Sequence, residues 1–394
     1  MFVANLKAAS PAVEAPRVFQ FEPAALVRAR SLAKANDASV STAIAQIRAD
    51  ADKALNGGPY SVTQKKHPLP GGDPHDYVSL APYFWPDPAK SDGIPYINRD
   101  GRRNPEIREY DATPFGDMSS HSNHLALGYY FTNDEKYADR AALILRTWFI
   151  DPATRMNPNL DHAQIIKGKD NGRPTGIIES LRLLPVIDAV GLLQGAKAWT
   201  ADDQKGVESW FRDYQRWMLE SKNGKGEGNA HNNHGCWYDV QVVTFALFLN
   251  DPTTARRVVE AARDRRIAPQ IEPDGSMPLE IRRANSFHYS IYNVQALTAL
   301  ADLGRRVDVD LWHFQTADHR SIPAALDFLL PFATGRQKWS HPEIGTLSPS
   351  GLLIPVRRAA SGLNDPKYET AAQTILKTDG SEKDSLLHPA RASQ

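Results

Sequence analysis

The chain has 394 residues, of which 41% are hydrophobic and 23% are charged, a composition typical of a globular protein that can bury a large core. Lysine plus arginine and aspartate plus glutamate each total 46, and this neutrality excludes the broad positive field with which proteins gather nucleic acid. Cys236 is the only cysteine, which excludes an internal disulfide, and no apolar run is long enough to insert into a membrane.

Helical periodicity dominates the chain beyond its first 20 residues. Those residues lack a basic start followed by an apolar core, so an exported form must already have lost its signal peptide. Turn signals such as the Thr200-Ala-Asp-Asp start and LNDPTT at 249–254 leave short connections, which favour antiparallel helical pairs. In chain order, the predicted helical segments are 23–55, 122–131, 135–149, 175–195, 201–220, 231–249, 253–267, 278–303 and 322–333.

These segments predict an all-α fold. We expect an α/α toroid, an incomplete α/α barrel of six or seven antiparallel helical hairpins, in which residues 1–394 form a single domain with long irregular cleft loops. Residues 57–118 are rich in Pro, Gly and aromatic residues, and an irregular segment of this length is usually functional. We interpret it as an ordered cleft wall, with 156–176 as a neighbouring rim and 362–394 as a peripheral tail.

Two clusters of polar and aromatic residues mark the candidate site. HNNHGCWYD at 231–239 opens a helical segment, where Asn232 or Asn233 can cap the helix and His234 can satisfy a buried acceptor, or all three can meet a ligand. EIRRANSFHYSIYN at 280–293 contributes Arg283 and Tyr289. These two are six residues apart and share a face only if Arg283 lies in the loop that enters the helix.

Other chemistries remain open at this point. His231, His234 and His288 could join Asp239 around a zinc ion, although the spacing matches no zinc signature. Glycoside hydrolysis needs two carboxylates, but no sequence pattern selects a pair. The acidic residues available for that reaction are Glu280, Asp239, Asp117 and Asp111. A GxSxG nucleophile elbow is absent from the sequence.

Three motifs in order resemble the alginate lyase superfamily, most closely polysaccharide lyase family 38. They are DYVSLAPYFWPDP at 76–88 with the following DGIPYINRDGRRNPE, then NNHGCWYD, then RRANSFHY, and the resemblance covers roughly residues 60 to 340. It implies an α/α toroid that cleaves alginate or glucuronan by β-elimination. The family's Asn-His pair, Arg and Tyr match Asn233, His234, Arg283 and Tyr289, although Arg282 and His288 are adjacent alternatives.

The resemblance also implies roles for these four residues. Arg283 and Asn233 would neutralise the substrate carboxylate as charge moves onto it. Tyr289 would transfer protons as base and acid, provided that a cation such as Arg283 lowers its pKa. His234 would take the C5 proton where it lies on the opposite face of the sugar from the C4 oxygen, as in α-guluronate.

Further residues are candidates for sugar binding. Tyr83 and Trp85 lie among prolines, where aromatic rings suit a sugar-binding cleft, whereas Trp237 is equally suited to a helical core. Lys167, Lys169 and Arg173 suit either outer carboxylates or a solvated loop. The full set of predicted substrate-binding residues is Tyr83, Trp85, His124, Asn232, Trp237, Arg282, His288 and Tyr292.

The sequence therefore predicts a periplasmic or secreted polysaccharide lyase that needs neither metal nor cofactor. Its partner would be an anionic polysaccharide, glucuronan or mannuronate-rich alginate, whose uronates differ only at C2. Two alternatives remain: a glycoside hydrolase on the same toroid and a uronan-binding protein without activity.

Overall fold

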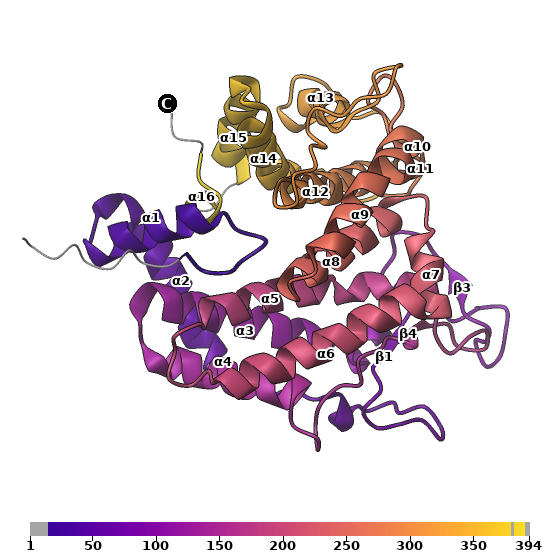
Figure 1. Ribbon diagram of the computed structural model, residues 1–394. Coiled ribbons are helices and arrows are strands. Elements are labelled where there is room, and N and C mark those ends of the chain that lie inside the picture. Colours follow the sequence, from indigo (N-terminus) through magenta and orange to yellow (C-terminus); the bar gives the residue numbers. More distant parts are fainter. Residues whose placement is uncertain (1–14, 380–381, 391–394) are drawn as a thin grey trace, which may run out of the picture.

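A computed structural model describes residues 15–379 and 382–390 (Figure 1). The first 14 residues, on which the expectation about an export signal partly depends, lie outside this description. Within the described ranges, no helix combines the length and the apolar character needed to cross a membrane. The α-helices are α1 (Pro23–Lys34), α2 (Ser41–Ala54), α3 (Ala112–Thr132), α4 (Glu135–Phe149), α5 (Leu183–Leu192), α6 (Ala201–Glu220), α7 (Lys222–Gly228), α8 (Asn233–Phe248), α9 (Pro252–Ala262), α10 (Ala268–Gln270), α11 (Pro278–Ile281), α12 (Ser286–Arg305), α13 (Ile322–Ala333), α14 (Leu353–Leu363), α15 (Pro366–Asp379) and α16 (Glu382–Leu387).

Helix starts follow the capping residues that the sequence carries. Thr200 accepts a hydrogen bond from the backbone N–H of Asp203, and the Asp203 carboxylate accepts one from the backbone N–H of Thr200, which forms a reciprocal capping box at the start of α6. The carboxylate of Asp251 caps α9, where Pro252 occupies the first helical position. The turn signals therefore separate consecutive helices as predicted.

The helices form two layers of an open ring (Figure 1). Helices α3, α5, α8, α12 and α14 contact one another in succession, and α2, α4, α9 and α15 pack beside them. Helices α8 and α12 are buried around most of their circumference, as expected for an inner layer. The short α16 packs against α2 and α1, which brings the end of the described chain back to its beginning. The predicted α/α toroid is confirmed.

Several boundaries differ from the sequence prediction. Residues 23–55 form two helices, because Asn36 adopts a left-handed backbone conformation just after α1. Helix α3 begins at Ala112, inside the segment that we expected to be irregular up to residue 118. A 3₁₀ helix at Pro174–Arg182 precedes α5, and residues 282–285 separate α11 from α12.

The end of the chain packs more deeply than its polar composition indicates. Tyr368, Ala372 and Ile375 of α15 are fully buried in the main hydrophobic core, and Leu387 of α16 joins them. The expectation of a peripheral tail after residue 362 does not fit this packing. The buried apolar residues of α15 and α16 pack into the same core as the helices of the ring.

The Pro-rich segment is held to the ring by short strands. Strand β1 (Val78–Leu80) pairs in parallel with β4 (His162–Ile165), and β2 (Phe84–Trp85) pairs antiparallel with β3 (Ile97–Asn98). The β1–β4 pairing places segments 57–118 and 156–176 side by side. A second hydrophobic cluster joins the two segments, formed by Val78, Leu80, Ala81, Tyr96, Tyr110, Ile165 and Ile166. The strands thus fix one wall of a cavity over the ring.

Candidate active site

A cavity of about 530 Å³ lies where the Pro-rich segment faces helices α8 and α12. It brings together stretches of chain that are far apart in the sequence. Its lining residues are Pro82, Tyr83, Phe84, Asn98, Asp100, Arg103, Gln164, Arg173, Thr175, Ile178, Glu179, Arg182, Asn233, His234, Arg283, His288, Tyr289 and Tyr292.

Tyr289 and Arg283 line this cavity together. Arg283 lies in the link between α11 and α12, and Tyr289 lies in the first turn of α12, which is the condition under which both can face one site. The guanidinium carbon of Arg283 is 3.7 Å from the centre of the Tyr289 ring. The phenol oxygen of Tyr289 is 2.6 Å from that of Tyr83, whose segment comes from the opposite wall.

The surroundings of the Tyr289 phenol favour its protonated form. Burial, followed by the hydrogen bond with Tyr83, raises its pKa above the usual value, and Arg283 only partly offsets this. Arg283 acts to lower this pKa, as a role of Tyr289 as base requires, but burial outweighs its effect. A neutral phenol is a proton donor.

Asp100 holds Arg283 in place. Its carboxylate accepts hydrogen bonds from Nε and Nη2 of Arg283, at 3.0 and 2.7 Å, and from the backbone N–H of Ala284. This contact also lowers the pKa of Asp100. Because Asp100 takes only the Nε edge of the guanidinium, the N–H groups of Nη1 remain for another acceptor.

His234 is oriented by a buried carboxylate. Its Nδ1 is 2.6 Å from Oε1 of Glu227, a residue of α7 that is only 1% exposed. When Glu227 accepts the Nδ1 proton of a neutral imidazole, Nε2 of His234 keeps a free lone pair. An imidazole in this tautomer can act as a base toward a group in the cavity.

Asn233 is held by a second buried carboxylate, that of Glu280, which is 1% exposed. The backbone nitrogen of Asn233 and its Nδ2 lie 2.7 Å from the two carboxylate oxygens of Glu280. Burial raises the pKa of Glu280, although the contacts with Asn233 and Arg283 oppose this. The Oδ1 of Asn233 is buried without a hydrogen-bond partner among the described residues.

The cavity has an excess of positive charge. Arg103, Arg173 and Arg182 line it in addition to Arg283, against the carboxylates of Asp100 and Glu179. The Glu179 carboxylate accepts hydrogen bonds from the hydroxyl groups of Tyr77 and Ser79, both at 2.6 Å. Arg173 donates to Gln164. A local cationic site of this kind is what a neutral chain needs to bind an anion.

Two predicted sugar-binding aromatics lie in the cavity wall. Tyr292 lines it, with the ring of His288 stacked at 6.0 Å. Tyr83 lines it from the opposite side. Of the three cations considered for outer carboxylates, Arg173 also lines the cavity. Lys167 does not line it and pairs instead with Glu106.

Five predicted substrate-binding residues lie outside the lining: Trp85, His124, Asn232, Trp237 and Arg282. The indole of Trp85 donates to the backbone oxygen of Arg102, and that of Trp237 packs behind Tyr292 at 5.1 Å. His124 lies on α3 and interacts electrostatically with Asp50 of α2.

The alternative ligand sets are not assembled. His231 is exposed, and Asp239 forms a buried ion pair with Arg266 at 2.7 Å. In the described ranges no group of three His, Cys, Asp or Glu side chains is placed to hold a metal ion. None of the four carboxylates considered for hydrolysis lines the cavity. Asp111, for example, is buried and accepts the backbone N–H of Val78.

Sequence reasoning did not identify Asp100 or Glu227. Asp100 lies in the motif DGIPYINRDGRRNPE, but 183 residues separate it from Arg283. Glu227 precedes His234 by seven residues and reaches it only because α7 ends just before α8 begins. The signal available in the sequence was an acidic residue, Glu227, seven positions before a histidine already predicted to be catalytic.

This chain is similar to known proteins in both sequence and structure. Residues 61–339 match the sequence profile of the family described as alginate lyase. The structure is similar to that of an alginate lyase from Bacteroides ovatus, with a TM-score of 0.91 and 35% identity across 95% of this chain and 100% of the other. A comparison with curated protein sequences finds no match.

More distant structures share the fold. Alginate lyase A1-III from Sphingomonas species A1 matches with a TM-score of 0.57 and 16% identity, over 95% of this chain and 98% of that one. A variant of alginate lyase A1-III in complex with a tetrasaccharide matches with a TM-score of 0.61, also at 16% identity, over 97% and 98%. At this level of identity the likeness concerns the toroid itself.

Proposed function

The chain belongs to the alginate lyase family and is a polysaccharide lyase that acts on a uronic-acid polymer, and we propose that this polymer is glucuronan or mannuronate-rich alginate. One observation carries the proposal. Tyr289, His234, Asn233 and Arg283 line a single cavity, although they come from two separate stretches of chain. Because such polymers are too large to enter a cell intact, we place the enzyme in the periplasm or outside the cell.

The reaction removes the C5 proton beside the sugar carboxylate and breaks the bond between C4 and the glycosidic oxygen. The electrons of the C5–H bond form the C4–C5 double bond, and the leaving oxygen takes up a proton. Charge moves onto the carboxylate as the C5 proton leaves, so donors that neutralise this group lower the barrier most. Arg283 supplies a permanent charge for this purpose, through the Nη1 edge that Asp100 leaves available.

Asn233 supplies a second donor if its amide is turned so that Nδ2 faces the cavity. Rotation of the amide by 180° exchanges Oδ1 and Nδ2 in place. A protonated Glu280 then donates to Oδ1, which otherwise has no partner, and still accepts the backbone N–H of Asn233. The raised pKa of Glu280 favours this protonated form. Glu280 is thus a positioning residue for the Asn233 amide.

The role of Glu280 in positioning the Asn233 amide predicts different effects on kcat for two substitutions of Glu280. In Glu280→Gln, the new amide donates to Oδ1 of Asn233 and accepts its backbone N–H, so kcat should stay within about threefold of wild type. In Glu280→Ala, Asn233 loses its anchor, and kcat should fall about 10-fold to 100-fold, as when outer-shell partners are lost elsewhere. Initial rates on both polymers, with melting temperatures as a check of folding, test this. Equal damage in both variants would mean that Glu280 acts as a carboxylate.

Proton transfer is assigned to Tyr289 and His234. The protonated phenol of Tyr289 donates to the leaving oxygen, and Nε2 of His234 accepts the C5 proton where the two groups lie on opposite faces of the sugar. In β-mannuronate and β-glucuronate they lie on the same face. On these substrates Tyr289 first passes its own proton to His234. The resulting phenolate then removes the C5 proton and donates it to the leaving oxygen.

The function is tested by incubating the protein with glucuronan and with alginate while recording ultraviolet absorbance and reducing ends. A lyase raises both signals, because each cut creates an unsaturated uronate and a new reducing end. A hydrolase raises reducing ends alone, and a binding protein raises neither. The relative rates on the two polymers identify the preferred uronate, and absence of absorbance on both refutes the proposal.

A further inference from the structure

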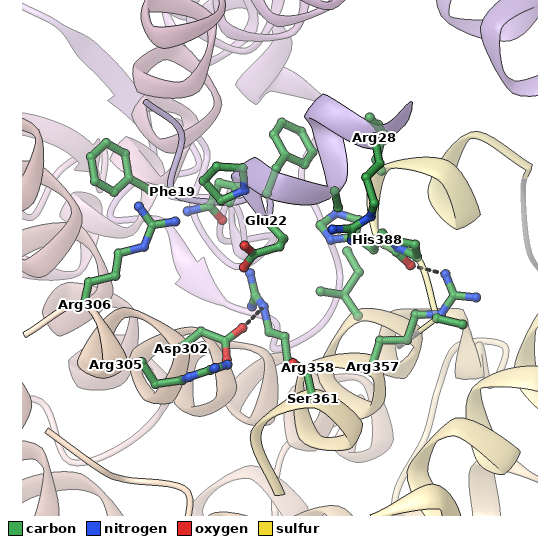
Figure 2. Close-up of a pocket in the computed structure, with 18 residues that line it drawn as sticks. Phe19, Glu22, Arg28, Asp302, Arg305, Arg306, Arg357, Arg358, Ser361 and His388 are labelled. Carbon is green, nitrogen blue, oxygen red and sulfur yellow. Dashed lines mark hydrogen bonds and ion pairs between the residues drawn. The ribbon is translucent and has the colours of Figure 1, made fainter. Parts of the chain in front are cut away.

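A second large cavity lies where the two ends of the described chain meet the ring (Figure 2). Its volume is about 580 Å³, which lies within the range of small-molecule sites. Four stretches of chain form its walls: residues 19–28, the end of α12 with Arg306, α14, and residues 387–390, which begin at the last residue of α16. It shares no lining residue with the catalytic cavity.

Guanidinium groups dominate this second cavity. Arg28, Arg305, Arg306, Arg357 and Arg358 line it, and Glu22 and Asp302 are the only carboxylates in its lining. Figure 2 shows these arginines arranged around the hollow, with Asp302 beside Arg358. In a chain with no net charge, five arginines in one cavity are a marked local concentration.

Five carboxylates act on these arginines: Glu22 and Asp302 in the lining, Asp188 near Arg306 and Arg358, and Glu369 and Asp384 near Arg357. Burial raises the pKa of Asp188 to about 7 and also raises that of Asp302, so these carboxylates offset only part of the charge. Asp302 pairs with Arg358 at 3.3 Å, and Arg357 donates to the backbone oxygen of His388. The buried Asp188 lies behind the cavity, where its carboxylate accepts the backbone N–H groups of Phe19 and Gln20. Burial, followed by the nearby arginines, lowers the pKa of His388 to about 3, so this ring adds no charge.

Several donors in the cavity remain open. Arg357 is only 7% exposed, yet its Nε has no hydrogen-bond partner among the described residues. Arg305 and Arg306 are exposed, and neither forms an ion pair within 4 Å with any described residue. Buried donors of this kind are normally satisfied, and guanidinium forks match the geometry of carboxylate and phosphate oxygens.

We propose that this cavity is a second binding site, separate from the catalytic one, for a small oxyanion with more than one negative charge. Two sources offer this chemistry: a short uronate oligosaccharide, which presents several carboxylates, and a phosphate. The first source rests on the proposed function, because such oligosaccharides are its products. A bound anion would bridge α12 and α14 to the first and last described segments of the chain, and so stabilise the fold.

The proposal is tested by calorimetric titration of the full chain at constant ionic strength, with inorganic phosphate in one arm and an unsaturated diuronate in the other. Arg306→Gln is expected to weaken binding at least about tenfold, since a charge-assisted fork is lost. Arg305→Gln provides a second exposed position that does not perturb the core. Arg336→Gln, at an exposed arginine elsewhere, is the matched control. Arg173→Gln, in the catalytic cavity, reports any diuronate bound there and is compared separately.

Binding of either probe that Arg306→Gln weakens and Arg336→Gln leaves unchanged supports the proposal. The arm that responds identifies the source of the oxyanion. No binding in either arm overturns it, as does binding that Arg306→Gln and Arg305→Gln leave intact. Turnover of polymer by Arg306→Gln should equal that of wild type. Loss of lyase activity in every sample would therefore count against the proposed function and not against this site.

Discussion

Replacing Tyr289 with phenylalanine is expected to reduce kcat by about 1000-fold, the middle of the range for loss of a positioned proton donor. The reason is that the phenol protonates the leaving oxygen on every substrate, and on β-linked uronates it also removes the C5 proton. Only the hydroxyl changes, so the ring keeps its contact with Arg283. Steady-state rates on the preferred polymer measure the effect, with KM expected to change little.

Tyr83→Phe is the matched control for this variant. It removes the hydroxyl that contacts Tyr289 at 2.6 Å, but leaves the catalytic phenol in place, so the loss of kcat should stay below about tenfold. Thermal melting of both variants should remain near that of wild type, because each loses one partly buried hydroxyl. Wild-type turnover by Tyr289→Phe on its best substrate would refute the proton-transfer assignment.

Arg283→Gln is expected to lower kcat about 100-fold to 1000-fold, the usual cost of losing a donor that acts on charge in the transition state. Arg283→Lys should also fall well below wild type, because an ammonium group lacks the planar fork that binds a carboxylate on one edge and Asp100 on the other.

Arg282→Gln separates the two adjacent arginines that the sequence leaves as alternatives. Arg282 does not line the cavity, so this substitution should leave kcat and KM close to wild type. Because Arg283→Gln also removes the partner of Asp100, melting temperatures are needed to show that the variant folds. If Arg282→Gln were the damaged variant and Arg283→Gln the active one, the carboxylate assignment would move by one residue.

The toroid could be predicted because its evidence is local. Apolar periodicity marks each helix, and Thr200 and Asp251 mark where two of them begin. The break between α1 and α2 combines the left-handed backbone of Asn36 with a short 3₁₀ helix at Ala38–Val40, and apolar periodicity does not detect either feature. The burial of Tyr368 depends on where α15 meets the ring, a contact that a polar composition conceals.

The candidate site was predictable to the extent that its residues lie in two short motifs. Their partners were not, because Tyr83 and Asp100 approach Tyr289 and Arg283 across 206 and 183 residues of chain. The net direction in which the pKa of Tyr289 shifts could not be predicted from the sequence either. The proximity of a cation could be inferred, but the burial that outweighs it depends on how the opposite wall closes over the phenol.

The local charge of the catalytic cavity governs how a polymer first reaches it. Four arginines face two carboxylates there, while the molecule as a whole is neutral. In physiological salt the attraction between exposed charges fades beyond about 8 Å. Long-range steering therefore contributes little, and encounter with the polymer depends mainly on diffusion and collision. Added salt should therefore weaken the binding of polymer that is already in the cavity more than it slows the association of polymer with the enzyme.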